Sequence, residues 1–273
     1  KMAAAFGFGL ASGSVGSFVG IGGALLAVPL MKGAPYRLPQ IAANATALPA
    51  NVCVCCASAL AFASAGEVDA PAAALVALSA SATTAVGARA AHSLTKRSQS
   101  AAFGLGMLAL APLIAAKPYL TTPAHGNDER LRRVESGASA SPPPPPPLSM
   151  ERAAYFVALG GATGLASGVL GIGAGSMITL GLALGGNLES HKRVLGTSFA
   201  AQLLPHAVGA GVHYRLGNLR TGIAPALALG SGIGAAVGAR VAAEYAPEES
   251  LRVGFALFVL ALGAHTLLRL PPV

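Results

Sequence analysis

Two short runs of small residues can form a binding site for an anion. Glycine lets the backbone turn its N–H groups towards a ligand, and the helix that follows such a run presents the positive end of its dipole. A site of this kind needs no fixed cation, which agrees with the lack of charged residues in both runs. For any single glycine the alternative is close packing of helices. The runs comprise Gly20, Gly22, Gly23 and Ala24, and then Gly171, Gly173 and Gly175.

Hydroxyl and amide side chains follow each run at similar distances along the chain. Asn44 and Thr46 follow the first run, and Thr197 and Ser198 follow the second. Their donors can complete the shell of an anion, because hydrogen bonds are stronger where water is scarce. A threonine in a membrane also commonly bonds to its own helix or to a neighbouring helix. The sequence leaves both roles open.

Gln202 and His206 lie one helical turn apart, on one face of a predicted helix. An ionisable group inside a membrane is a candidate for function, here as a proton relay or a substrate contact. The alternative is a histidine whose ring is satisfied by a backbone carbonyl. His206 has no counterpart in the first half of the chain, where Cys55 takes its position.

The three cysteines lie in one apolar segment. Only Cys53 and Cys56 are three residues apart and share a helix face, and no histidine or carboxylate is close in sequence to Cys55 or its neighbours. Buried small side chains are therefore favoured over a metal site. The chain also has no phosphate-binding loop, nucleophile elbow or zinc-hydrolase motif. We predict no catalytic residue, no metal, no cofactor and no enzyme activity.

The composition indicates a membrane protein. Of the 273 residues, 53% are hydrophobic and 10% are charged, whereas a soluble domain has about 25% charged residues. The apolar segments run for about twenty residues, the length that crosses a hydrocarbon core of about 30 Å. The 18 Lys and Arg are scattered between these segments and form no basic face, so no nucleic-acid partner is predicted.

The chain contains an internal repeat with an offset of 151 residues. Thr46 then aligns with Thr197, Gly66 with Gly217, and the signature glycines align with each other. Matched residues kept in register over about seventy positions indicate a duplicated unit. We therefore predict an all-α polytopic membrane protein with about eight transmembrane segments in two homologous repeats of four.

The repeat defines three regions: a first repeat at 1–116, a charged and proline-rich flexible linker at 117–152, and a second repeat at 153–273. Long segments interrupted by glycine at corresponding positions favour a broken first helix in each repeat, and simple tilt is the alternative. If each first segment re-enters instead of crossing, the repeats are inverted. The predicted segments are 3–31, 41–65, 70–91 and 101–116, and then 153–185, 194–214, 221–243 and 251–269.

The glycine pattern and the threonine about twenty residues after it resemble the sulfite exporter TauE/SafE family. The motif spans Gly16 to Met31 in the first repeat and Gly164 to Leu184 in the second, and the resemblance covers nearly the whole chain except the linker. It implies a membrane protein that moves small sulfur-containing or organic anions. The chain departs from its own first motif where Leu180 stands in place of Pro29, and the proline-rich linker is unusual.

Together these patterns predict a secondary transporter or exporter of small anions. The resemblance alone implies that these anions contain sulfur, as sulfite and sulfonates do. The anion is expected at the repeat interface, between the two glycine runs, with Thr46 and Thr197 as hydrogen-bond donors. The expected partners are the substrate anion and the lipid bilayer of the plasma membrane, and a homo-oligomer is compatible with the sequence. A membrane scaffold protein and a cysteine-dependent redox protein remain the alternatives.

Overall fold

The structure is a computed structural model. It describes residues 1–20, 22–33, 35–90, 147–170, 175–188 and 190–268, with four isolated positions between 101 and 112. Every regular element in these ranges is a helix, which confirms the all-α prediction. The predicted segment 101–116 and the linker up to residue 146 fall largely or wholly outside the described residues, as do Gly171 and Gly173.

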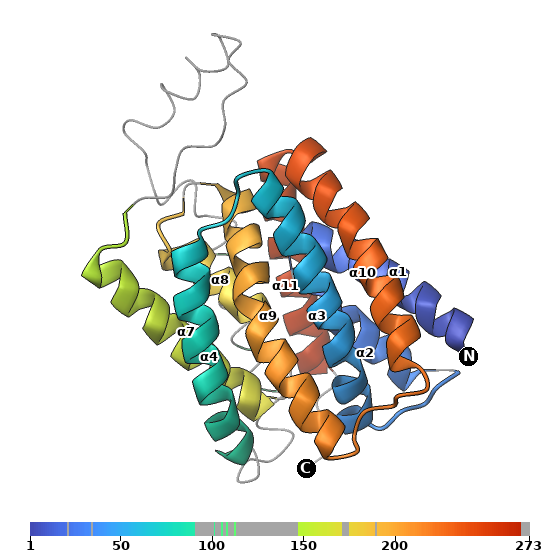
Figure 1. The fold of residues 1–273 in the computed structure, drawn as a ribbon. Helices are drawn as coiled ribbons and strands as arrows, with labels where there is room; N and C mark the ends of the chain where they lie inside the picture. The colour runs from blue at the N-terminus through green and yellow to red at the C-terminus, as the bar shows by residue number, and fades with distance from the viewer. Residues whose placement is uncertain are drawn as a thin grey trace.

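The described helices fall into two groups along the chain, one before and one after residues 91–146 (Figure 1). The first half contains α1 (Met2–Val19), α2 (Ala24–Lys32), α3 (Gln40–Ser64) and α4 (Ala70–Ala90). The second half contains α7 (Met150–Leu170), α8 (Gly175–Gly185), α9 (His191–Arg215), α10 (Ala224–Arg240), a π-helical turn η2 (Val241–Tyr245) and α11 (Glu248–Leu268).

The helices α3 and α9 form the centre of the bundle and run antiparallel (Figure 1). Near the start of α3, Thr46 bonds to the turn that follows α9. Near the end of α3, Phe62 stacks on Phe199 at 6.2 Å between ring centroids, and Phe199 lies in the early part of α9. Each helix has 25 residues. The two helices occupy matched positions in the two halves, and because they are antiparallel they cross the molecule in opposite directions.

Glycines allow two other helix pairs to pack at very short range. Three glycines of α10, four residues apart, face the backbone of α1. They are Gly230, Gly234 and Gly238, and they meet Phe6, Leu10 and Ser14 in that order. A Cβ on any of these three glycines would overlap that backbone, so only glycine permits the approach. Because the residue numbers rise together in both helices, α1 and α10 are parallel. Gly160 and Gly164 of α7 meet α4 in the same way.

The first apolar segment is broken and returns to the end of the molecule where it starts. The helix α1 ends before Gly20, which has φ 85°, and Gly22 has φ 75°. The chain then descends through α2, and the Tyr36 hydroxyl donates a hydrogen bond to the carbonyl of Lys1. The segment 3–31 thus forms two helices in a hairpin, so its helix is broken and is not a single tilted helix. Glycine is required at both positive-φ positions.

Charged side chains hold the opposite end of the bundle together. Asp69, in the turn between α3 and α4, pairs with Arg152 at the start of α7, with 3.1 Å between oxygen and nitrogen. Glu67 of the same turn lies 3.7 Å from Arg193 at the start of α9. The hairpin of α7 and α8 therefore starts and ends near this turn, just as α1 and α2 start and end near Tyr36.

Two helices in the described ranges are both long and apolar enough to cross a bilayer unaided, namely Ile41–Ser64 and Ala224–Tyr245. Shorter apolar helices cover Met2–Phe18, Ala70–Thr84 and Gly175–Gly185. The short ones include one arm of each hairpin, α1 and α8. The helix lengths in the described residues therefore do not confirm the predicted eight spans.

Candidate functional site

Buried polar side chains meet where α3 and α9 cross. Asn51 Nδ2 lies 3.3 Å from His206 Nε2, and His206 Nδ1 lies 2.8 Å from the carbonyl oxygen of Gln202. A carbonyl only accepts, so Nδ1 carries the proton and Nε2 accepts from the Asn51 amide. Cys55 Sγ lies 3.8 Å from the same Nδ1. The contacts fix His206 as a neutral ring with both nitrogens bonded.

These side chains are matched across the repeat. Asn51 and Gln202 are 151 residues apart, and so are Cys55 and His206. All four are buried, with exposed fractions of at most 4%. The crossing of α3 and α9 is therefore a place where equivalent positions from both halves touch each other, with different side chains at each pair.

The break in the first hairpin borders this cluster. A Cβ on Gly22 would lie 3.6 Å from Gln202 Oε1, and one on Gly23 would lie 3.6 Å from Asn51 Oδ1. Neither amide oxygen has a hydrogen-bond partner within the described part of the chain. Leaving a buried polar group unpaired costs about 1–3 kcal/mol, so two such oxygens beside one chain break need an explanation.

A chain of hydrogen bonds links the crossing to both signature runs. Gln202 Nε2 donates to Ser198 Oγ at 2.8 Å, and Ser198 Oγ lies 2.6 Å from Thr179 Oγ1. Thr179 Oγ1 also lies 2.9 Å from the carbonyl oxygen of Gly20. Ser198, a candidate from the sequence, is thus bonded to the buried cluster, whereas Thr179 was not among the sequence candidates. The signal for Thr179 is that it is a hydroxyl within the second motif, Gly164 to Leu184, at the position where the first motif has Val28.

Thr46 and Thr197 lie away from this cluster and bond to turns of the opposite half. Thr46 Oγ1 donates to the carbonyl of Ala42 at 2.6 Å and accepts from the backbone N–H of Arg220 at 3.1 Å. Thr197 Oγ1 accepts from the backbone N–H of Asp69 at 2.9 Å. Asp69 and Arg220 are themselves 151 residues apart. The hydroxyl proton of Thr46 is thus already used, and the contact with a neighbouring helix is the role that this geometry favours.

The remaining predicted residues are spread along the hairpins. Gly20, Gly22 and Gly23 are buried in the break, and Ala24 begins α2. Gly175 is buried at the start of α8, and Asn44 is half-buried in the first turns of α3.

The cysteines do not form a common site. Cys55 is buried against His206, Cys53 is half-buried, and Cys56 is exposed. Within the residues that the structure describes, no three His, Cys, Asp or Glu side chains gather to hold a metal ion. This arrangement gives no support to the redox alternative, because the three thiols differ in burial and only Cys55 lies in the buried cluster.

A helical bundle with a glycine-broken hairpin and a polar cluster in its buried centre has the architecture of a membrane transporter. The comparison with protein families agrees: the model of the sulfite exporter TauE/SafE family matches residues 5–266. The chain belongs to the TauE/SafE family, whose members are integral membrane transporters of sulfite and related anions and not enzymes. Neither the curated proteins nor the solved structures gave a match.

Proposed function

We propose that this chain is a secondary transporter of small anions, with sulfur oxyanions such as sulfite and small sulfonates as the substrate class. The proposal includes two inverted repeats of four segments each, 1–116 and 153–273, joined by the linker 117–152, in the plasma membrane. Support for the inversion comes from the antiparallel course of α3 and α9, and from Thr46 and Thr197, which bond to matched turns.

The anion would bind between the break at Gly20–Ala24, the run at Gly171–Gly175 and the crossing of α3 and α9. The observation that carries this proposal is the pair of buried, unpaired amide oxygens on Asn51 and Gln202 beside the break. A primary amide has two donors opposite its oxygen, so half a turn of the Gln202 amide would direct an N–H group at the same position while Oε1 accepts from the Ser198 hydroxyl. This amide would then bind an anion, whereas Asn51 keeps its bond to His206 Nε2.

The packing suggests which parts would move. The glycine contacts make α1 with α10, and α4 with α7, two tightly packed pairs, and each pair takes one helix from each half. In the proposed cycle these pairs rock about the crossing of α3 and α9, so that the site opens to each side in turn without any nucleotide. The threonine bonds to the turns would keep α3 and α9 in register during this motion.

The test is uptake of radiolabelled sulfite, and of a small sulfonate, into proteoliposomes. Gln202→Met removes the amide and keeps the length of the side chain. Uptake should fall about tenfold or more, the equivalent of one or two hydrogen bonds to a charged group. Folding should be little affected, because the lost bond to Ser198 is offset by removal of the unpaired Oε1.

The matched control is Ser231→Ala in the contact between α1 and α10. Ser231 Oγ is another buried atom without a partner in the described ranges, but it does not border the break, so uptake should be unchanged. Uptake by Gln202→Met equal to that of the unmodified chain would remove the site from the crossing. Flux equal to empty vesicles from the folded, unmodified chain would favour the scaffold alternative.

A further inference from the structure

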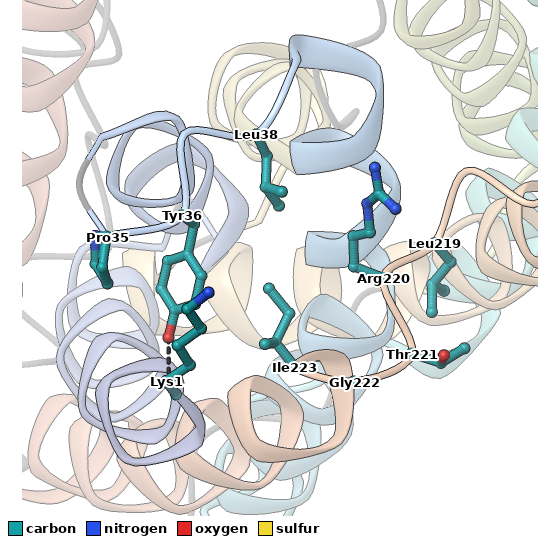
Figure 2. Close-up of a pocket in the computed structure, with 9 residues that line it drawn as sticks. All are labelled: Lys1, Pro35, Tyr36, Leu38, Leu219, Arg220, Thr221, Gly222 and Ile223. Atoms are coloured by element: carbon teal, nitrogen blue, oxygen red, sulfur yellow. Dashed lines mark hydrogen bonds between the residues drawn. The ribbon is translucent and has the colours of Figure 1, made fainter.

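A cavity of about 400 Å³ with both polar and apolar lining residues opens at the end of the bundle where α9 turns into α10. Figure 2 shows Lys1 and Tyr36 on one side of it and Arg220 on the other. Lys1 and Arg220 are exposed, so two cations face one space. Burial raises the pKa of the Tyr36 phenol above its ordinary value, so this side chain stays neutral and adds no negative charge.

A second cavity of about 380 Å³ adjoins the first and is lined almost entirely by apolar groups. The two cavities share Leu219 and Thr221. The second continues between α3, α9 and α10, where Pro49, Tyr214 and Pro225 contribute to its walls. A cationic space therefore passes directly into an apolar one.

The order of the two cavities along the helices matches the order of the head-group and acyl-chain layers of a membrane. The two long apolar helices begin at Ile41 and Ala224. The residues that line the first cavity come mostly before these positions, whereas Pro49 and Pro225 of the second lie after them. The cations are thus at the level of lipid head groups and the apolar cavity is at the level of acyl chains.

We propose that an anionic glycerophospholipid binds here, with its phosphate between Lys1 and Arg220 and one acyl chain in the apolar cavity. Guanidinium and ammonium groups are the usual partners of phosphate, and an apolar cavity that faces a bilayer is filled by lipid. The site goes beyond the proposed transport function and does not depend on it.

The matched position at the opposite end of the bundle does not supply the same cation. Asp69 stands at the position that matches Arg220, and its carboxylate is buried in the pair with Arg152. A carboxylate repels a phosphate, so the repeat does not duplicate the proposed phosphate contact of Arg220.

Native mass spectrometry of the purified chain tests the site by comparing phosphatidylglycerol with phosphatidylcholine. The unmodified chain should bind phosphatidylglycerol about 25-fold more tightly, since each of the two cations near an anionic head group adds about a factor of five. Arg220→Gln should reduce this preference to about fivefold and Arg220→Lys should retain it. Arg215→Gln is the matched control, because Arg215 is an exposed cation of the last turn of α9 that is not among the lining residues of either cavity.

Gly211→Leu tests the acyl-chain cavity. A Cβ at Gly211 would meet no atom within 4 Å, so the new side chain can fill the cavity without a clash. It should weaken the binding of both lipids while the thermal unfolding midpoint is preserved. Equal binding of the two lipids by the unmodified chain, or an unchanged preference in Arg220→Gln, would overturn the proposal. A third result would also overturn the proposal: soluble glycerol phosphate displaces the lipid, and Gly211→Leu binds lipid normally. That combination would indicate a site for free anions.

Discussion

Thr197 accepts a hydrogen bond from the backbone N–H of Asp69, and both groups are buried. Thr197→Val has nearly the same shape but leaves this N–H without its acceptor, which should cost about 1–3 kcal/mol. Thr197→Ser keeps the hydroxyl and should recover most of the loss. The measurement is the thermal unfolding midpoint in detergent. If valine and serine gave the same midpoint as threonine, the bond would contribute nothing to stability.

At the site, the sequence identified some residues and missed others for a clear reason. Gln202 and His206 stood out because polar groups are rare in apolar segments, and both lie in the buried cluster. Asn51 was missed, since its partner His206 is 155 residues away in sequence. Moving Gln202 back by the repeat offset gives Asn51, so the repeat contained the signal. The sequence did not indicate that Thr46 contacts the turn at Arg220, because this contact depends on how the two halves are packed.

Among the elements, the contact between α1 and α10 offers a direct test of glycine packing. In Gly234→Ala the methyl group would overlap the backbone of Leu10, so the helices must separate, at a cost of about 1–3 kcal/mol. Gly254→Ala in α11 is the matched control, because a Cβ there meets no atom within 4 Å. It should be neutral or stabilise by up to about 1 kcal/mol through helix propensity. Equal unfolding midpoints for the two variants would contradict the tight contact.

The positions of the helices were more predictable than their partners. The predicted segment 41–65 agrees with α3 at Gln40–Ser64, because a long apolar run defines a helix by itself. The predicted segment 3–31 is instead α1 and α2, and only the glycines indicated that it divides. The glycine spacing in α10 indicates close packing against another helix, but it does not specify which helix. The choice of α1 as partner depends on the complete fold.

For the whole molecule, the two ends of the bundle differ in charge although their turns are matched. The turn with Asp69 is held by ion pairs, whereas the turn with Arg220 borders an open, cationic cavity. A pair of parallel repeats would place both turns on the same side of the membrane, and inverted repeats place them on opposite sides. The sidedness of the turns therefore decides between the two arrangements.

Ser64 and Arg215 are exposed, end α3 and α9, and are 151 residues apart. In a background with Cys53, Cys55 and Cys56 replaced by alanine, Ser64→Cys and Arg215→Cys should react with an impermeant maleimide from opposite sides of the membrane. Arg37→Cys should react from the side of Arg215→Cys, because the first hairpin returns to that end. Labelling of Ser64→Cys and Arg215→Cys from one side would mean that every first segment crosses, and the repeats would then be parallel.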